Sequence, residues 1–303
     1  MGDFVRQRRD GDFVGVPIRN AIVFTFGVHV RIAFGLSFVF AIDLAVRVSF
    51  QFAFGDVRSV VSGDLTILYL TVNAMPLMWQ QFHMGHLLRA AEGRPMVVIS
   101  KEPMELGRPD TEYLIQSGPY CAWNVYRQLL RGAKLADTQY VAVAEDDTLY
   151  PAKHFSDFRP PDDAVAYDMS RWSVFSWVKQ PFFSAIRKCG NFSMIGPRKL
   201  VIDALKEREE KYPDGHDYAG EIGRADVERR LKVGRRNRVE WYCTEPMVNL
   251  CHPRGLSPTY TETRGLERKP GELKSLECPI WGKASDIAAI YNQGAAEELP
   301  CKT

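Results

Sequence analysis

Three consecutive carboxylates, Glu145, Asp146 and Asp147, directly follow an apolar run at residues 140–144. Such a run is typical of a buried strand in a sheet that helices cover on both faces. Open α/β sheets bind ligands where their strands end, so the acidic turn is a candidate site. Adjacent carboxylates repel one another unless a cation or hydrogen-bond donors hold them, and their oxygen atoms suit Mg²⁺ or Mn²⁺ bound to a diphosphate. The alternative is a solvated acidic turn without a ligand.

Predicted strands and helices alternate along the segment that leads to this turn. Strands at 65–71, 96–100 and 140–144 enclose helices at 80–91 and 120–136. Short links between such elements indicate a parallel sheet with right-handed crossovers. The sequence therefore predicts an α/β fold with a mainly parallel central sheet flanked by helices. The second half is more mixed, with strands expected at 164–168, 172–178, 239–242 and 247–251 and helices at 197–211 and 226–233.

The composition is that of an ordinary globular protein and identifies no partner. With 303 residues, the chain is long enough for one large or two modest domains. The formal net charge is only +2, although residues 229–238 form a basic cluster, RRLKVGRRNR. The six cysteines include no CxxC pair, so we expect reduced thiols in a cytoplasmic protein.

The N-terminal segment follows a different pattern. Every even position from 22 to 54 is a large apolar residue, which is the period-2 signature of a strand held far beyond the usual strand length. Arg31, Asp43 and Arg47 interrupt the segment, so we expect no stable membrane insertion. We treat residues 1–63 as an N-terminal extension that is an added β element, a poor membrane anchor or not native structure.

The order of these features resembles that of GT-A glycosyltransferases, and within them the family-2-like enzymes, over residues 64–256. The acidic triplet is similar to the family's DxD motif, and His252 follows a late strand as the family's metal-binding histidine does. The resemblance implies a Rossmann-like nucleotide-binding half, a mixed acceptor half and a divalent ion, Mn²⁺ or Mg²⁺, held by Glu145, Asp147 and His252. Residues 257–303, rich in Gly and Pro punctuation, are expected to form a loop-rich tail.

Residues 224–234 (RADVERRLKVG) look like the family stretch that carries the catalytic base. The resemblance implies Asp226 as the base that takes the proton of the acceptor hydroxyl. The spacing to Leu231 is shorter than is usual in the family, so Glu221 and Asp217 on the preceding loop stay as rivals. A plain helix N-cap is the structural alternative for Asp226.

Polar residues at the ends of the first two strands, and on the helix before the acidic turn, are candidates for contacts to the nucleotide. This set comprises Thr71, Asn73, Ser100, Asn124 and Arg127, together with Glu145 and Asp146. Further candidates for sugar, phosphate or acceptor contacts are Arg131, Arg171, Trp172, Trp177 and Arg187.

The leading hypothesis is a metal-dependent glycosyltransferase of the hexosyltransferase class. It would move a sugar from a nucleotide-diphosphate sugar to an acceptor hydroxyl with inversion. A second hypothesis takes DNA with hydroxymethylated pyrimidine bases as the acceptor, because the basic cluster lies close to the proposed base. A nucleotidyltransferase and a non-catalytic nucleic-acid-binding module are two further hypotheses. Residues 71–76 contain no glycine for a phosphate loop, which argues against the nucleotidyltransferase. No protein partner follows from the sequence.

Overall fold

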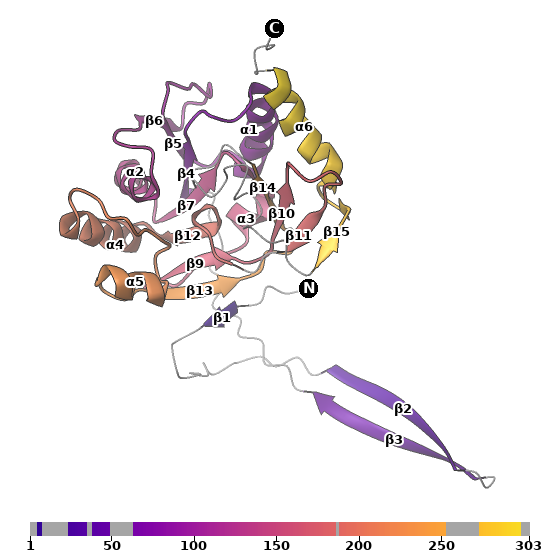
Figure 1. Ribbon diagram of the computed structural model, residues 1–303. Helices are drawn as coiled ribbons and strands as arrows, with labels where there is room; N and C mark the ends of the chain where they lie inside the picture. Colours follow the sequence, from indigo (N-terminus) through magenta and orange to yellow (C-terminus); the bar gives the residue numbers. More distant parts are fainter. Residues whose placement is uncertain are drawn as a thin grey trace.

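The computed structural model describes residues 63–185, 188–252 and 273–297, and the backbone of three strands nearer the N-terminus. Its largest sheet has the strand order β1-β13-β9-β12-β7-β4-β5-β6 (Figure 1). The strands are β1 (Val5–Gln7), β4 (Leu65–Thr71), β5 (Met96–Ser100), β6 (Thr111–Ile115), β7 (Tyr140–Glu145), β9 (Ala164–Asp168), β12 (Met194–Pro197) and β13 (Asn237–Trp241).

Most of this sheet is parallel. Strands β7, β4, β5 and β6 run in one direction, with Leu65 opposite Tyr140 and Thr71 opposite Ser100. Strand β12 is antiparallel to both β7 and β9, so β9 has the same direction as β7, and β13 is parallel to β9. The expected fold class, an α/β protein with a mainly parallel sheet flanked by helices, is confirmed.

Helices cover both faces of the sheet. On one face α1 (Leu77–Ala91) packs with Ile67 and Tyr69 of β4 through Leu87. On the other, α2 (Ala122–Leu135) packs with Leu68 and Leu70 through Leu129, beside α4 (Arg198–Lys211). Alternate residues of β4 are therefore buried against different helices, which is why the strand is apolar on both faces. Helix α4 begins directly after Pro197, as the sequence predicts.

A second sheet carries the late part of the chain, with the order β15-β11-β10-β14-β8. The buried carboxylate of Asp168 connects this sheet to the first one. Its Oδ1 accepts hydrogen bonds from the backbone N–H groups of Ser170 at 2.8 Å and Cys243 at 3.3 Å. Its Oδ2 accepts a hydrogen bond from His154 Nδ1 at 3.0 Å. These contacts fix both crossovers between the sheets. The strands of this second sheet are β8 (Thr148–Leu149), β10 (Arg171–Phe175), β11 (Phe183–Ala185), β14 (Met247–Cys251) and β15 (Lys274–Ser275).

Residues 284–297 form a helix, α6 (Ala284–Glu297), where the sequence predicted a loop-rich tail. Ala284, Ile287, Ala288 and Tyr291 are buried and recur at helical spacing, a stripe that the Gly and Pro punctuation before it obscured. They pack against Trp79 of α1, so the helix is part of the core. A short hairpin, β16 (Glu277–Cys278) and β17 (Gly282–Lys283), precedes it, and residues 253–272 lie outside the described part of the chain.

Several other elements differ from the prediction. Helix α1 begins at Leu77 rather than at residue 80, β10 ends at Phe175 rather than at 178, and α5 (Ala225–Leu231) is shorter than expected. Strands β8, β11 and β12 and helix α3 (Ala152–Ser156) were not predicted, because each is too short for a periodic pattern to stand out. Strand β6 was not predicted either, because it is largely exposed and lacks the apolar run of the buried strands.

The N-terminal strands agree with the period-2 pattern as far as their backbone is described. Strands β2 (Phe24–Phe34) and β3 (Phe38–Val48) pair antiparallel over all their residues, from Phe24↔Val48 to Phe34↔Phe38. Strand β1 pairs antiparallel with β13 and extends that edge of the large sheet. Among the described residues, no helix combines the length and apolar character needed to cross a membrane.

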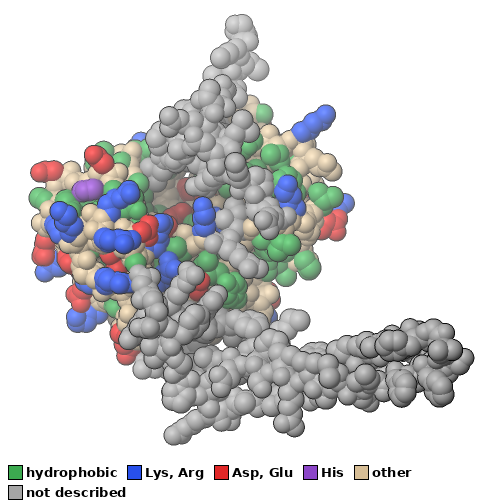
Figure 2. All heavy atoms as spheres, turned by 60° about the horizontal axis from the view of Figure 1, so that its bottom comes forward, with side chains coloured by type: hydrophobic (Ala, Val, Ile, Leu, Met, Phe, Trp, Pro, Cys, Tyr) green, Lys and Arg blue, Asp and Glu red, His purple; other side chains and the backbone are tan. Residues whose placement is uncertain are grey.

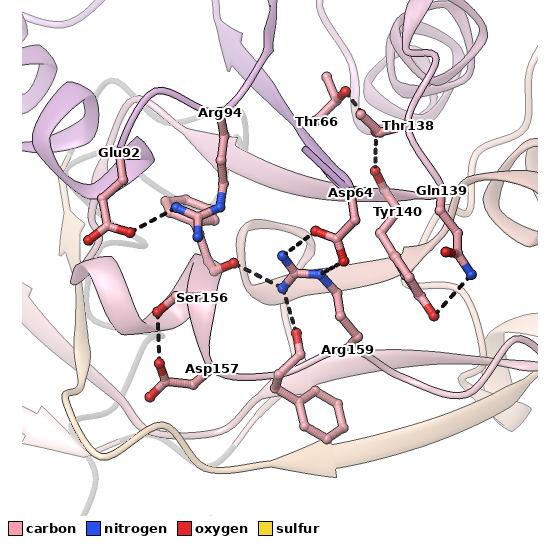
Figure 3. Close-up of polar contacts among 12 residues, drawn as sticks. Asp64, Thr66, Glu92, Arg94, Thr138, Gln139, Tyr140, Ser156, Asp157 and Arg159 are labelled. Carbon is pink, nitrogen blue, oxygen red and sulfur yellow. Dashed lines mark hydrogen bonds and ion pairs between the residues drawn. The ribbon is translucent and has the colours of Figure 1, made fainter. Parts of the chain in front are cut away.

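Polar side chains hydrogen-bond with one another at the end of the sheet where β4 and β7 begin (Figure 3). Arg159 binds the Asp64 carboxylate through Nη2 at 2.8 Å and Nε at 3.0 Å, and it also donates to the carbonyl groups of Phe155 and Phe158. Thr66 and Thr138 share a hydrogen bond of 2.8 Å nearby. The acidic turn therefore lies at the opposite edge, where the same strands end.

Candidate functional site

The acidic turn lies where the strand order reverses. From β4 the chain passes through α1 to β5 and β6 on one side, and then through α2 to β7 on the other side of β4. Ligands of open α/β sheets bind at this point, beyond the carboxyl ends of the two diverging strands. Thr71 ends β4 and its Oγ1 donates to Asp146 Oδ2 at 2.5 Å. Two residues predicted from separate strands therefore meet at the switch point.

Asp146 has an electrostatic environment that disfavours its charge. Its pKa is raised to about 7, mainly by burial and then by the neighbouring charge of Asp147, while the hydrogen bond from Thr71 acts in the opposite direction. The residue as a whole is only partly buried. Its raised pKa therefore reflects the protein atoms packed around the carboxyl group. A cation bound beside the two carboxylates would relieve their repulsion.

Asp147 and His252 lie side by side at one end of the second sheet, because Asp147 precedes β8 and His252 follows β14. Strand β14 pairs antiparallel with β8, with Asn249 opposite Thr148, so the end of β14 is brought beside the acidic turn. His252 Nε2 lies 3.8 Å from Asp147 Oδ2, and the histidine side chain is 6% exposed. Asp147 Oδ1 also accepts a hydrogen bond of 3.0 Å from Thr148 Oγ1.

This donor set fits a divalent cation. The Asp147–His252 separation is too long for a direct hydrogen bond, and it exceeds the roughly 3 Å between neighbouring ligands of an ion held at about 2.1 Å, so the two side chains would draw closer on binding it. A carboxylate and an imidazole suit Mn²⁺ and accept Mg²⁺ less readily. In the part of the chain that the structure describes, however, no three His, Cys, Asp or Glu side chains form one cluster, so Glu145 does not join the pair as a third ligand.

Asn73 and Ser100 stabilise the loops beside the acidic turn. Asn73 has a left-handed backbone (φ 56°), and its Oδ1 accepts the backbone N–H groups of Lys101 and Glu102, both at 2.9 Å. Its own N–H donates to Thr71 Oγ1 at 3.0 Å. Ser100 is buried, and its carbonyl accepts the N–H of Gln116 at 2.8 Å. The side-chain oxygen of Asn73 is thus engaged by backbone N–H groups.

The predicted residues of α2 contact the helix itself or neighbouring segments rather than the acidic turn. Asn124 Oδ1 accepts a hydrogen bond of 3.0 Å from Gln128, and Arg127 donates to the carbonyl group of Pro213 in the loop after α4. Arg131 donates to the carbonyl group of Ile115 at 3.1 Å. The structure therefore places Asn124 and Arg127 apart from the contacts of Asp146 and Asp147.

Arg224 binds two of the three candidates for the catalytic base, Asp226 and Glu221. Its Nε and Nη2 lie 3.1 and 2.7 Å from the carboxylate oxygens of Asp226, and its Nη1 lies 2.8 Å from Glu221 Oε2. The hydrogen bonds from Arg224 lower the pKa of Asp226, whose side chain is 53% exposed, whereas the Glu221 side chain is 16% exposed. A carboxylate with a lowered pKa is a weak base.

The two carboxylates also differ in their place in the fold. Gly223 packs against Asn237 and Val165, near the beginnings of β13 and β9, which is the edge opposite to the acidic turn. Glu221 instead lies within electrostatic range of Tyr126, whose pKa is raised by burial and then by Glu221, with a smaller contribution from Glu145.

Two of the six basic residues in the cluster at 229–238 form ion pairs within the described part of the protein. Arg236 pairs with Glu207 at 2.9 Å and Arg238 with Glu240 at 2.7 Å. On the face shown in Figure 2, Lys and Arg side chains are interspersed with Asp and Glu. Of the remaining candidates, Trp172 packs against Phe183 and Arg171 lies over the ring of Phe192, while Arg187 lies outside the described residues.

Three residues near the acidic turn were not found from the sequence. Trp79 and His83 of α1 bind backbone carbonyl groups of the turn, and Tyr120, which is half exposed, lies within electrostatic range of Asp146 and Asp147. The i, i+4 spacing of Trp79 and His83 was the available signal, but such a pair on a helix is equally typical of ordinary core. Only the packing of α1 against β8 shows what they bind.

No protein-family model matches the chain, and no curated protein sequence does. Solved structures similar to it include a mannosyltransferase from Pyrobaculum calidifontis in complex with GDP-Man and Mn²⁺, with 11% identity, a TM-score of 0.40, and 66% of this chain and 60% of that one covered. Glycosyltransferase GlyE from Streptococcus pneumoniae has 8% identity and a TM-score of 0.37, with 56% and 42% covered. A nucleotidyl transferase from Methanothermobacter thermautotroptrophicus has 10% identity and a TM-score of 0.34, with 63% and 89% covered.

The chain spans less than two thirds of the length of either glycosyltransferase. At TM-scores of 0.40 and below, these likenesses carry no argument about activity. The functional assignment of this chain must rest on its own geometry.

Proposed function

We propose that this chain is a metal-dependent glycosyltransferase that binds a nucleotide-diphosphate sugar at the carboxyl ends of β4 and β7. The observation that carries the proposal is the approach of Asp147 Oδ2 and His252 Nε2 to 3.8 Å beside a second carboxylate at the strand-order reversal. A buried imidazole that faces the Asp147 carboxylate, next in the chain to Asp146 with its raised pKa, is more than a solvated acidic turn needs.

In this proposal Asp147 and His252 hold the divalent ion, and Thr71 orients Asp146 beside it. The ion, when bound, neutralises negative charge that develops on the leaving diphosphate. Tyr120 lies exposed near both aspartates and is suited to contact the donor from the solvent side. The acceptor hydroxyl needs a general base, and we propose Glu221 for this role because Asp226 is exposed and lowered in pKa by Arg224.

The test is a donor screen on the full chain. Nucleotide-diphosphate sugars of each common base are incubated with Mn²⁺, with Mg²⁺ and with a chelator, and release of the nucleoside diphosphate is measured. We expect release from one donor class only when a divalent ion is present, and loss of that release in Asp147→Asn while the circular dichroism spectrum is unchanged. Full activity in the chelator-treated protein would exclude the metal role.

A parallel incubation with nucleoside triphosphates and sugar phosphates, in which pyrophosphate is measured, separates a nucleotidyltransferase from a glycosyltransferase. A nucleotidyltransferase would consume a nucleoside triphosphate with a sugar phosphate and release pyrophosphate, without hydrolysing a nucleotide sugar. Pyrophosphate release would therefore replace the glycosyltransferase proposal by nucleotidyl transfer.

A further inference from the structure

Three consecutive backbone carbonyl groups in the acidic turn each accept a hydrogen bond from another element. Trp79 Nε1 donates to the carbonyl of Asp146 at 2.8 Å, and the N–H of Leu250 donates to the carbonyl of Asp147 at 2.7 Å. His83 Nε2 contacts the carbonyl of Thr148 at 2.9 Å. Helix α1 therefore binds the turn on both sides of Asp147, and β14 binds it in the middle.

The two donors of α1 are themselves immobilised. Trp79 and His83 lie one helical turn apart and are almost fully buried. The Trp79 ring packs edge-on against Tyr291 of α6, with 6.3 Å between the ring centroids. The His83 ring stacks on Tyr69 of β4, with 5.6 Å between the centroids. Neither ring can follow the turn if the turn moves, so the three hydrogen bonds fix the backbone of residues 146–148.

His83 acts as a neutral donor in this arrangement. Burial lowers the pKa of His83 to about 4, and the described residues offer its Nδ1 no hydrogen-bond partner. The proton of the neutral ring therefore lies on Nε2, where it meets the carbonyl oxygen of Thr148.

The fixed backbone keeps the Asp146 and Asp147 side chains from moving apart. Adjacent carboxylates in a flexible turn would rotate the chain to separate their charges, but these carbonyl groups are held at both ends of Asp147. The two side chains then stay close together in the metal-free protein, and a divalent ion at Asp147 would favour the charged form of both. A turn held in this way binds an ion without first losing backbone entropy.

We propose that Trp79 and His83 are positioning residues that hold the acidic turn in its metal-binding conformation. The inference rests on the proposed function, since it needs an ion at Asp147. It assigns to α1 a role in metal affinity that is separate from its role in the core.

The test measures binding of Mn²⁺ alone to the full chain, from the electron paramagnetic resonance signal of free Mn²⁺. Trp79→Phe keeps an aromatic ring against Tyr291 but removes the N–H donor, and His83→Leu removes the donor at similar volume. We expect each to raise the dissociation constant for Mn²⁺ by about 10- to 100-fold, as is usual when a residue that orients a metal ligand is lost. His83→Gln retains an N–H group and should recover most of the affinity.

His86→Leu is the matched control, because His86 lies on the same helix and contacts the rings of Phe82 and Trp281 instead of the turn. It should leave the affinity for Mn²⁺ unchanged while removing a partly buried ring from the same helix. Thermal unfolding of every variant shows that the protein is folded at the temperature of the binding measurement. If His83→Leu does not fold, Trp79→Phe and His83→Gln decide the question.

The two proposals fail in different ways. Wild-type affinity in Trp79→Phe and His83→Leu, with Mn²⁺ binding intact in the wild type, would overturn the positioning role alone. An equal loss in His86→Leu would also overturn it, because packing rather than donation would then control the affinity. Absence of Mn²⁺ binding in the wild type would overturn the metal-dependent function, and the positioning role with it.

Discussion

Asn249 Nδ2 donates to Thr148 Oγ1 at 3.1 Å, although the two residues lie on strands of distant parts of the chain. Thr148 Oγ1 in turn donates to Asp147 Oδ1 at 3.0 Å. Because one hydroxyl accepts from Asn249 and donates to Asp147, the orientation of the proposed metal ligand depends on β14 as well as on its own turn. This buried relay links the second sheet to the acidic turn.

The relay predicts the effect of Thr148→Val. Valine has a similar shape but cannot donate to Asp147 and leaves the Asn249 amide without its acceptor. We expect an affinity for Mn²⁺ about tenfold lower and a loss of about 1 to 3 kcal/mol in the free energy of unfolding. Titration with Mn²⁺ and denaturant unfolding measure the two effects.

Thr66→Val provides the control for Thr148→Val. Thr66 is also a buried threonine, but it bonds Thr138 at the opposite edge of the sheet. It should lose stability and keep the affinity of the wild type for Mn²⁺. Weakened Mn²⁺ binding in both variants would mean that general destabilisation, not the relay, governs the metal site.

The contrast between Glu221 and Asp226 predicts which carboxylate acts as the base. Glu221→Gln should lower the transfer rate by a factor of about 10² to 10⁴, the usual contribution of a general base. Asp226→Asn should stay close to wild type, because Arg224 already holds that exposed carboxylate in its charged form. Single-turnover rates at saturating donor, with calorimetry of donor binding, are the measurements.

The reverse order of effects would restore Asp226 as the base. Wild-type rates in both variants would instead indicate that neither carboxylate accepts the proton, as in a retaining mechanism. Arg224→Gln, which releases both carboxylates, should raise the pKa of Asp226 in either case, because the guanidinium group is the main cause of its lowering.

Buried His83 predicts how the stability of the protein depends on pH. The ordinary histidine pKa of 6.5 applies to the unfolded chain, whereas burial lowers it to about 4 in the folded protein. Unfolding therefore takes up a proton between these values, so this contribution to stability is complete above pH 6.5 and is lost as the pH falls towards 4. The slope is at most about 1.4 kcal/mol per pH unit.

Comparison with His83→Gln isolates this contribution. The charges that face His83 are those of Asp147 and, to a smaller extent, His86, and both remain in the variant. Denaturant unfolding between about pH 7 and pH 5 should show a less steep loss of stability in His83→Gln than in the wild type. Parallel pH profiles would show that His83 is not the group that takes up the proton.

A protein that begins at Gly63 should fold and bind Mn²⁺ as the full chain does. The sheet from β6 to β13, the second sheet and all residues of the proposed site lie at or beyond Asp64, and among the described strand pairings that involve this part the deletion removes that of β13 with β1. Circular dichroism and Mn²⁺ titration check this expectation. Insoluble protein would show that the N-terminal residues protect the edge of β13.

The sequence by itself determined the alternation of strands and helices and the place of the acidic turn. Runs such as Leu65–Thr71 are long, apolar and bounded by turn residues, so their pattern is recognisable without tertiary information. The same reasoning put Glu145, Asp146 and Asp147 at the end of a central strand, because parallel strands in an α/β sheet end on one side. Thr71 was selected on the same ground, and it contacts Asp146.

The family resemblance groups Asp147 with His252, but only the tertiary structure decided how the two meet and which of the other polar residues join them. Asp147 and His252 come together because β14 pairs antiparallel with β8, a strand of two residues that no periodic pattern reveals. Asn73 and Arg127 were chosen by their positions as candidates for nucleotide contacts, but they bind neighbouring loops. A polar side chain at a strand end or on a helix is equally able to contact a ligand or to hydrogen-bond a loop, so the sequence does not separate the two roles. Trp79 and His83 resemble core residues in sequence, and only the approach of α1 to the turn makes them hydrogen-bond donors to it.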